Sequence, residues 1–530
     1  SSPVGKGPMT MHIFAMIAGK FRFRDRKPEE WVNCRSLLSS VHLALLLPLM
    51  INAGCQPEAQ PSVPTEWEAV RPDGVDASED VASAQPDASA KSPQDSDLAP
   101  MNDSSLASTV TDSWGRKFFT DVERFQQAPK IREVRLPVSD GDEAIWGATG
   151  RDAKGNIYFG LASKASSELS AGLLQFSPRT GETTLLGRVD EWLSSQDSNR
   201  KTSLQDKIHS KFFEATDGNL YFASQDETGE KSDGSANGKE GGYLMRVNRS
   251  TGKVESVLQT KTALISIGCS GRYIYALGYF GSMIYQFDTK LQSTRNVLIP
   301  NYGGHVSRNI LVTPTGHVLA LRVTGTTLDD TRPGTNWTPP VAQDQATDQI
   351  ETSEEGTLRR RVLVELVELD PNLKELHAWP MKGYEAHGDT SSHGITSFAS
   401  LMDGSLLFTT QNGLLWRVHA SDGKPDRLES FGWIHPDGES SSTAMFAPTG
   451  NDYVIAVTKI GRRFDLLVYY LRLRESVPLT LDLDSDKVFN QPLHLLFGSE
   501  TLDDFGNAYI AGWKRMPTGY EPLALQLQWP

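Results

Sequence analysis

A short alternation of polar and apolar residues recurs along the C-terminal four-fifths of this 530-residue chain. In each copy, a polar turn containing glycine leads into alternating β-branched and aromatic residues. The clearest copies are KGNIYFG from Lys154, DGNLYFA from Asp217 and DGSLLFT from Asp403. A turn of this chemistry followed by a period of two predicts a tight β-hairpin.

The phrase occurs seven times, counting looser copies, and each copy has a marker glycine. These glycines are Gly155, Gly218, Gly271, Gly316, Gly404, Gly450 and Gly506. Their successive spacings of 63, 53, 45, 88, 46 and 56 residues centre on the length of a four-stranded propeller blade. A second pair of strands follows each phrase, and one such sheet cannot bury both of its faces alone. We therefore predict an all-β fold, a seven-bladed β-propeller.

The spacing of 88 residues leaves room for an eighth blade, but its sequence favours an insertion. Between Thr324 and Arg361 the chain has three prolines and no alternating run, and strands resume at Val362. We expect this insertion to lie inside blade four.

The two ends of the repeat region predict how the ring closes. Leu523 to Pro530 supplies only the third strand of the last blade, and Lys130 to Val138 is a spare alternating strand before blade one. Pairing of Ile131–Val138 with Leu523–Trp529 would complete the blade and leave no unpaired edge there. The alternative is a flexible lead-in strand.

The Gly-Asn-hydrophobic-Tyr pattern of these turns resembles the loose superfamily of NHL-type, gluconolactonase-like and virginiamycin B lyase-like propellers. The resemblance covers about Lys130 to Pro530, and its motifs are structural turns. It implies the propeller fold. In the lyases it further implies histidines near the axis that hold a divalent metal and support proton abstraction and β-elimination.

Charge is distributed unevenly along the chain, whose net charge is −14. Residues 1–55 carry seven Lys/Arg and three Asp/Glu, residues 56–113 carry two and twelve, and the remainder carries 43 and 51. The repeat region is therefore mildly acidic and shows no basic stripe, which excludes nucleic acid as the expected partner. We expect the propeller, residues 127–530, to be a monomer.

The N-terminal part of the chain predicts an extracytoplasmic address. Residues 56–126, rich in Ala, Ser, Pro and Asp over most of their length, predict a disordered acidic linker. In the leader, residues 1–55, the apolar run Leu37–Cys55 follows a basic stretch and is too short and interrupted for a comfortable membrane span. Its end, Asn52-Ala53-Gly54-Cys55, resembles a bacterial lipoprotein signal, which implies acylation of Cys55; an ordinary secretory signal is the alternative. We expect a periplasmic or cell-surface protein that contacts the membrane through its lipid anchor only.

Three cysteines occur in the chain, Cys34, Cys55 and Cys269. The first should be removed with the leader and the second lipidated, so no disulfide within the propeller is expected. Cys269 is expected to be a small, buried strand residue and not a nucleophile.

Four histidines occupy one register at the start of the innermost strand of their blades. They are His209, His305, His393 and His494, which precede their marker glycines by nine, eleven, eleven and twelve residues. Trp146 holds the equivalent place in blade one and Ser441 approximately so in blade six. The starts of innermost strands gather at one mouth of a propeller channel, so we expect these side chains to approach one another.

Converging imidazoles suit a divalent metal site or general acid–base work. We therefore assign these four histidines as candidate metal ligands and candidate catalytic residues. The alternative is that they bond only loop backbone or water. His387, beside Glu385 and Asp389, is a further candidate, although a solvated loop histidine is the simpler interpretation.

Two long inserts, residues 225–241 and 324–361, would wall a pocket over this mouth. We expect the protein to be a binding module that presents this face to a polymer, a glycan or a protein. The alternatives are a metal-assisted lyase or hydrolase acting on a carbohydrate or lactone, and a structural lipoprotein. The metal content of the purified protein separates the enzyme from the other two.

The lipoprotein interpretation predicts that Cys55 is the mature N-terminus and carries lipid. The roughly 70-residue tether that follows would reach on the order of 45 Å as a flexible coil, enough to clear a membrane surface. Mass spectrometry of the mature protein should find an acylated Cys55. An unmodified peptide that runs through Cys55 would contradict this.

Overall fold

The computed structural model describes residues 106–530, except 165–166, 201–203, 227–239, 280–281, 301–306, 330–351, 354–355, 358, 382–393, 462, 483–492 and 518. All described residues belong to one compact unit, Gly74–Pro530. The expected leader and most of the expected linker lie outside the described residues. In the part of the chain described here, no helix is long and apolar enough to cross a membrane.

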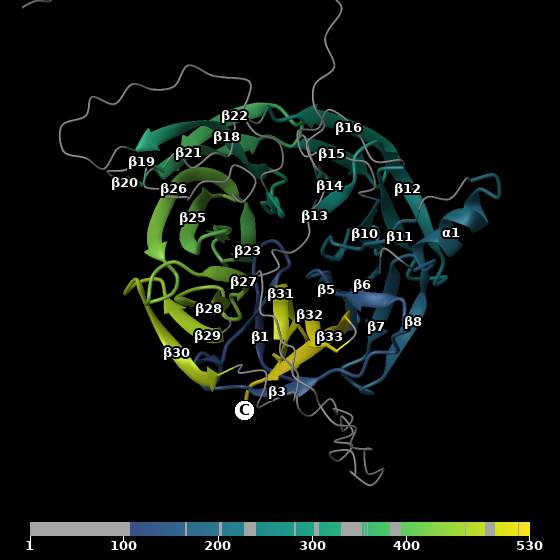
Figure 1. The fold of residues 1–530 in the computed structure, drawn as a ribbon, viewed down its shortest axis with the longest axis horizontal. Helices are drawn as coiled ribbons and strands as arrows, with labels where there is room; N and C mark the ends of the chain where they lie inside the picture. Colours follow the sequence, from purple (N-terminus) through teal and green to yellow (C-terminus); the bar gives the residue numbers. More distant parts are fainter. Residues whose placement is uncertain are drawn as a thin grey trace, which may run out of the picture. The chain divides into compact units, whose positions relative to one another are not determined.

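Seven antiparallel sheets, six of four strands and one of five, follow one another around a ring in the described structure. Figure 1 shows the first strand of each sheet near the centre of the ring and the last strand at its rim. The prediction of an all-β, seven-bladed propeller is therefore confirmed. Two further two-stranded sheets lie outside the blades.

The strands of each blade follow the order of the sequence. Blade one has β4 (Asp142–Ala144), β5 (Thr149–Arg151), β6 (Ile157–Ser163), β7 (Gly172–Phe176) and β8 (Thr183–Arg188), followed by helix α1 (Val189–Gln196). Blade two has β9 (Phe213–Glu214), β10 (Leu220–Gln225), β11 (Gly242–Val247) and β12 (Val254–Thr260). Blade three has β13 (Leu264–Ser270), β14 (Tyr273–Gly278), β15 (Met283–Asp288) and β16 (Ser293–Leu298). Blade four has β17 (Leu311–Val312), β18 (Val318–Asp329), β21 (Arg359–Leu369) and β22 (Glu375–Pro380).

The last three blades follow the same plan. Blade five has β23 (Ile395–Ser400), β24 (Leu406–Thr410), β25 (Leu414–Ser421) and β26 (Lys424–Trp433). Blade six has β27 (Ser441–Phe446), β28 (Tyr453–Ile460), β29 (Arg463–Tyr470) and β30 (Glu475–Asp482). Blade seven has β31 (Leu493–Leu502), β32 (Ala508–Met516), β33 (Gly519–Gln528) and, from the other end of the chain, β3 (Lys130–Glu133).

The predicted N-terminal strand closes blade seven, but it is shorter than the predicted Ile131–Val138, because strand pairing ends near Val134. β3 pairs antiparallel with β33, from Lys130 opposite Gln528 to Glu133 opposite Leu525. The backbone N–H of Val134 donates to the carbonyl of Ala524 at 2.8 Å and extends the pairing by one residue. Ile131 packs against the buried cluster between blades six and seven, so the closing strand also contributes apolar burial.

The insertion lies within blade four, as expected. β18 and β21 pair directly and extend the hairpin outward as far as Asp329 opposite Arg359. The segment between them, residues 330–358, contains a small sheet of β19 (Thr352–Ser353) and β20 (Gly356–Thr357). The rest of that segment lies outside the described residues.

A buried aspartate organises the recurring turn in blades one and seven. In blade seven, Asp503 Oδ1 accepts the backbone N–H groups of Phe505 and Asn507 at 2.9 Å each, and Oδ2 accepts the Tyr509 hydroxyl at 2.7 Å. In blade one, the hydroxyl of Tyr158 donates to Asp152 at 2.9 Å. Because the turn glycine takes a positive φ, +81° at Gly506, the turn folds back tightly enough for these contacts.

Neighbouring blades bury apolar side chains against each other. Between blades seven and one, the rings of Phe159 and Tyr509 lie 6.3 Å apart in one buried cluster. The same cluster continues to Phe222 of blade two, so three blades share it. Stacking around the axis therefore supplies the core that a single blade lacks.

The structure describes ordered backbone earlier in the chain than the predicted propeller boundary at residue 127. β1 (Thr109–Thr111) and β2 (Lys117–Phe119) form a hairpin, and a short 3₁₀ turn, η2 (Arg124–Gln126), follows it. Phe119 and Phe125 are buried in the cluster of blades six and seven. The composition of the linker concealed this segment, because its few aromatic residues gain their burial from the ring and not from one another.

Aromatic residues of this segment cover the marker glycines of three blades. A Cβ at Gly404 would lie 2.8 Å from the Trp114 ring, one at Gly450 would lie 2.5 Å from the Phe118 ring, and one at Gly506 would lie 3.2 Å from Phe125. In blade two, by contrast, a Cβ at Gly218 meets nothing within 4 Å.

This difference predicts unequal costs for two matched substitutions. Gly450 and Gly218 have φ values of +73° and +74°, so Gly→Ala adds the same backbone strain at both. Gly450→Ala should lower the free energy of unfolding by about 1–3 kcal/mol more than Gly218→Ala does, because only the methyl group at position 450 collides with a packed ring. Urea unfolding of both variants measures the difference. Equal losses would show that Phe118 does not pack on blade six as described.

Candidate functional site

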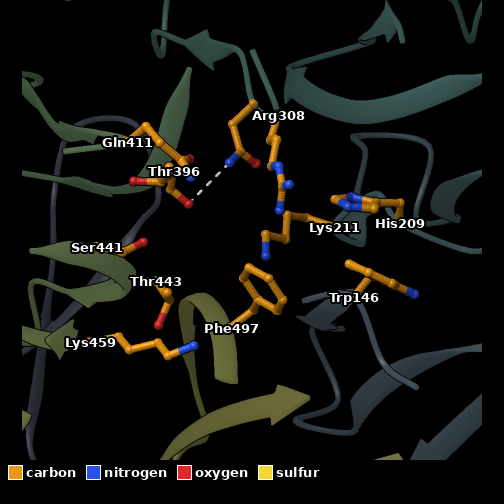
Figure 2. Close-up of a pocket in the computed structure, with 11 residues that line it drawn as sticks. Trp146, His209, Lys211, Arg308, Thr396, Gln411, Ser441, Thr443, Lys459 and Phe497 are labelled. Carbon is orange, nitrogen blue, oxygen red and sulfur yellow. Dashed lines mark hydrogen bonds between the residues drawn. The ribbon is translucent and has the colours of Figure 1, made fainter. Parts of the chain in front are cut away.

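A cavity of about 280 Å³ lies in the central channel and is lined from six of the seven blades. Figure 2 shows the side chains that surround it. Its lining residues are Trp146, His209, Lys211, Arg308, Asn309, Thr396, Gln411, Ser441, Thr443, Lys459 and Phe497. They come from positions up to 351 residues apart in the sequence, so only ring closure brings them together.

The cavity lies near the face of the ring at which the second strand of each blade ends. Gln411 follows the end of β24, and Lys459 lies in the last two residues of β28. The long β18 also leaves blade four by its C-terminal end, so the blade-four insertion starts from the same face. The prediction that the inserts roof this mouth concerns mostly residues outside the description and stays a prediction.

His209 lies on one side of the cavity against an aromatic group. Its ring stacks on Trp146, with centroids 6.0 Å apart and planes at 21°. Burial lowers the pKa of His209 well below its ordinary 6.5, and the charges of Arg308, Lys211 and Lys207 lower it further. His209 is therefore a neutral imidazole at physiological pH.

Lys211 places a buried amine beside the cavity. Only 7% of the residue is exposed, and its Nζ donates to the carbonyl of Gly147. Burial alone lowers the pKa of Lys211 from 10.5 to about 7. Glycine at position 147, with φ +82°, leaves room for this amine, because a Cβ there would lie only 3.0 Å from the lysine Nζ.

Positive charge dominates the cavity. Figure 2 shows Lys211 and Arg308 reaching toward its centre from one side, and the Lys459 amine pointing inward from the other. Burial lowers the pKa of Lys459 as well. Among the described residues that line the cavity there is no carboxylate. The remaining polar groups are hydroxyls and amides from blades four, five and six, which can donate to an anion.

The structure places some of the predicted site residues and leaves others undescribed. His209 lines the cavity together with Trp146 and Ser441, the two residues given equivalent places in the sequence register. His305, His393 and His387 lie outside the described residues. His494 falls on β31, but its side chain is likewise outside the description. The shared histidine site therefore stays a prediction.

A metal ion is not what the described part of this cavity favours. No group of three or more His, Cys, Asp or Glu side chains that could hold a metal occurs among the described residues. In addition, the positive charges of Arg308 and Lys459, and of Lys211 when it is protonated, would repel a divalent cation. The one described candidate ligand, His209, thus lies in a setting better suited to an anion.

Sequence reasoning missed Lys211, Arg308, Lys459 and Phe497. Lys211 and Arg308 lie two and three residues after His209 and His305, so the register that selected the histidines also contained them. Lys459 lies at the end of a second strand, where the sequence offered no reason to look. The signal that could have found the first two is a basic residue at the start of an innermost strand.

Cys269 follows its prediction in one respect. Burial raises the pKa of its thiol from 9.0 to about 12, which makes it a poor nucleophile at physiological pH. The residue is, however, only partly buried, because its strand borders a cavity at the other end of the channel.

Comparisons with known proteins leave the function open. No protein-family model matches the chain, and no curated protein sequence matches it. Among solved structures it is similar to the Cps50 (Swd1) β-propeller domain of Myceliophteria thermophila, at 13% identity and a TM-score of 0.44 over 75% of this chain and 99% of that chain. It is also similar to the RRP9 WD40 repeats, at 11% identity and a TM-score of 0.44 over 76% and 99%.

A third similar structure is that of U3-55K, at 11% identity and a TM-score of 0.42 over 75% of this chain and 99% of that chain. Similarity this low carries no argument about activity or partners. The finer resemblance to NHL-type and virginiamycin B lyase-like propellers stays a prediction.

The lowered pKa of Lys211 predicts how stability depends on pH. Between pH 7 and 10.5 the unfolded chain binds more protons at this lysine than the folded chain, so its contribution to the free energy of unfolding rises with pH. Below about pH 7 the folded state carries the full cost of burying the ammonium. Lys211→Met removes that cost. The free energy of unfolding of the variant, relative to that of the wild type, should therefore be about 1–3 kcal/mol higher at pH 6 than at pH 9.

Urea unfolding at the two pH values measures this gain. The exposed Lys290→Met variant is the control and should show no such difference. A Lys211→Met variant that destabilises equally at both pH values would contradict the lowered pKa.

Proposed function

We propose that this protein is a partner-binding propeller whose channel mouth takes an acidic group of its ligand. The observation that carries this proposal is the convergence of Lys211, Arg308 and Lys459 in one cavity whose described lining residues include no carboxylate. The positive charge of this cluster contrasts with the charge of the whole chain, which is −14. Buried positive charge is costly unless an anion compensates it, so a bound acid would relieve that cost.

The other walls of the cavity suggest what accompanies the acidic group. Trp146 and Phe497 lie with centroids 6.3 Å apart and offer apolar ring faces. Thr396, Ser441 and Thr443 add hydroxyl groups on the opposite side. Ring faces, hydroxyl groups and cations together suit a sugar acid, so an acidic glycan agrees best with these walls.

The address of the protein is part of the proposal. The lipoprotein-like signal at Cys55 supports an extracytoplasmic, lipid-anchored propeller, where acidic polysaccharides are accessible. The metal-assisted lyase or hydrolase is the alternative activity. It would need a cation in a cavity whose described side chains are already positive, so we favour binding over metal-dependent catalysis.

Calorimetric titration of the purified protein tests the proposal. A galacturonate trisaccharide should bind and the uncharged galactose trisaccharide should not, and binding should weaken as salt screens the charges. Arg308→Met and Lys459→Met should each weaken galacturonate binding about tenfold or more, since one charged hydrogen bond is lost. The exposed Lys290→Met should leave it unchanged.

Equal binding of both sugars would overturn the acidic preference. Retention of full affinity in both Arg308→Met and Lys459→Met would show that the acid binds elsewhere. A stoichiometric divalent metal in the purified protein, lost on His209→Ala, would favour the lyase or hydrolase instead.

A further inference from the structure

A second surface lies at the other end of the channel, where the N-terminal hairpin crosses the ring. We call residues 109–118 the hairpin tip. β1 and β2 pair only with each other in the described structure, so the tip belongs to no blade. Phe119 and Phe125, which follow it, are part of the core cluster of blades six and seven. The chain is thus firmly held from Phe118 onward, since Phe118 is buried as well, whereas residues 109–117 of the tip are exposed or partly exposed on the surface of the ring.

The tip is organised by its own residues. Asp112 Oδ1 accepts the backbone N–H groups of Trp114 and Arg116 at 2.9 Å each. Its Oδ2 accepts Nε–H of Arg116 at 2.7 Å, and the guanidinium lies 5.2 Å from the centre of the Trp114 ring. Because the turn supplies its own hydrogen bonds, it can keep its shape without the ring, as a separate peptide ligand would need to.

The ring receives three side chains of the tip at separate points. Trp114 lies over Gly404 and Gly423 of blade five, and Phe118 lies over Gly450 of blade six. Between these two aromatic residues, Arg116 donates to the carbonyl of Leu401 at 2.6 Å. Glycine at these turns leaves flat backbone against which a ring can pack, so this face has fixed places for aromatic side chains.

A carboxylate gives the surface its charge preference. Glu500 accepts the backbone N–H of Ser400 at 2.7 Å and its hydroxyl at 3.2 Å. Burial raises the pKa of Glu500, and the Ser400 hydrogen bonds and the positive charge of Arg116 oppose that rise. Unlike the cavity at the channel mouth, both cavities at this end have carboxyl groups among their described lining residues. The far end therefore suits a positively charged side chain flanked by aromatic groups.

The tip covers this surface incompletely. Two cavities of about 520 and 500 Å³ remain between the tip and the ring. Trp114, Arg116 and Glu500 border the first, and Arg116, Phe118 and Glu500 border the second. Protein cores are close-packed and contain few voids larger than a water molecule, so this contact differs from a core. The contact between the tip and the ring therefore resembles that of a docked segment that can dissociate.

We propose that the far end of the channel is a peptide-binding surface, which the hairpin tip occupies in cis and which a partner peptide with the same Trp-X-Arg-X-Phe pattern can occupy in its place. This surface shares one described lining residue, Lys211, with the channel mouth, and the proposal does not rest on the anion site. A linked segment acts at an effective concentration in the millimolar range, so the wild-type chain should resist exchange. Weakening the tip in cis should open the surface to a peptide in trans.

The test uses the full chain and a fluorescent peptide of residues 106–119. The double variant Trp114→Ala/Arg116→Ala should bind this peptide at micromolar concentration, at least about 100-fold more tightly than the wild-type chain does. Peptides with Ala at the Trp or the Arg position should bind at least tenfold more weakly. Adding Glu500→Gln to the double variant should reduce binding, whereas Glu182→Gln, which changes an exposed carboxylate of blade one that is not among the described lining residues of either cavity, should not.

A folded double variant that fails to bind the peptide would overturn the proposal and make the tip an integral part of the fold. Hydrogen exchange of the wild-type chain provides an independent measurement if the variant does not fold. Residues 109–118 should exchange by local opening, well before β3 does. Exchange of both segments only through global unfolding would equally overturn the proposal.

Discussion

The pairing of β3 with β33 is the interaction on which the rest of this structure depends. Each blade is a single sheet that buries its faces only against its neighbours, so a gap anywhere would expose two apolar faces at once. Four residue pairs between positions 130–133 and 525–528 prevent that gap by joining the two ends of the repeat region. The convergence of six blades on one cavity follows from the same closure, because no local contact holds those residues together.

The channel has ends of different character. At one end Lys211, Arg308 and Lys459 surround a cavity without a described carboxylate. At the other, Glu500 and Arg116, the latter from a segment that belongs to no blade, line the same cavities. The same scaffold therefore presents an electropositive mouth and a partly covered, carboxylate-bearing face, and each can select a ligand of opposite charge.

The electropositive mouth is a costly arrangement for the folded protein. Burial depresses the pKa of both Lys211 and Lys459. Burial and the charges of Arg308, Lys211 and Lys207 oppose protonation of His209. Groups whose ionisation is disfavoured in this way cluster at functional sites more often than elsewhere. A structural role explains only part of it, since the bond that the Lys211 amine donates to the Gly147 carbonyl does not require Arg308 or Lys459.

The sequence by itself determined the number of blades, the strand that closes the ring and the insertion in blade four. These features depend on local chemistry, namely a turn with a glycine at positive φ and an alternation that continues for the length of a strand. It did not determine that residues 106–126 pack on the ring, because Trp114 and Phe118 gain their burial only from backbone at positions 404 and 450. Nor did it determine the charge of the channel mouth. Lys211, Arg308 and Lys459 are separated by 97 and 151 residues, and only the closed tertiary structure decides that they meet.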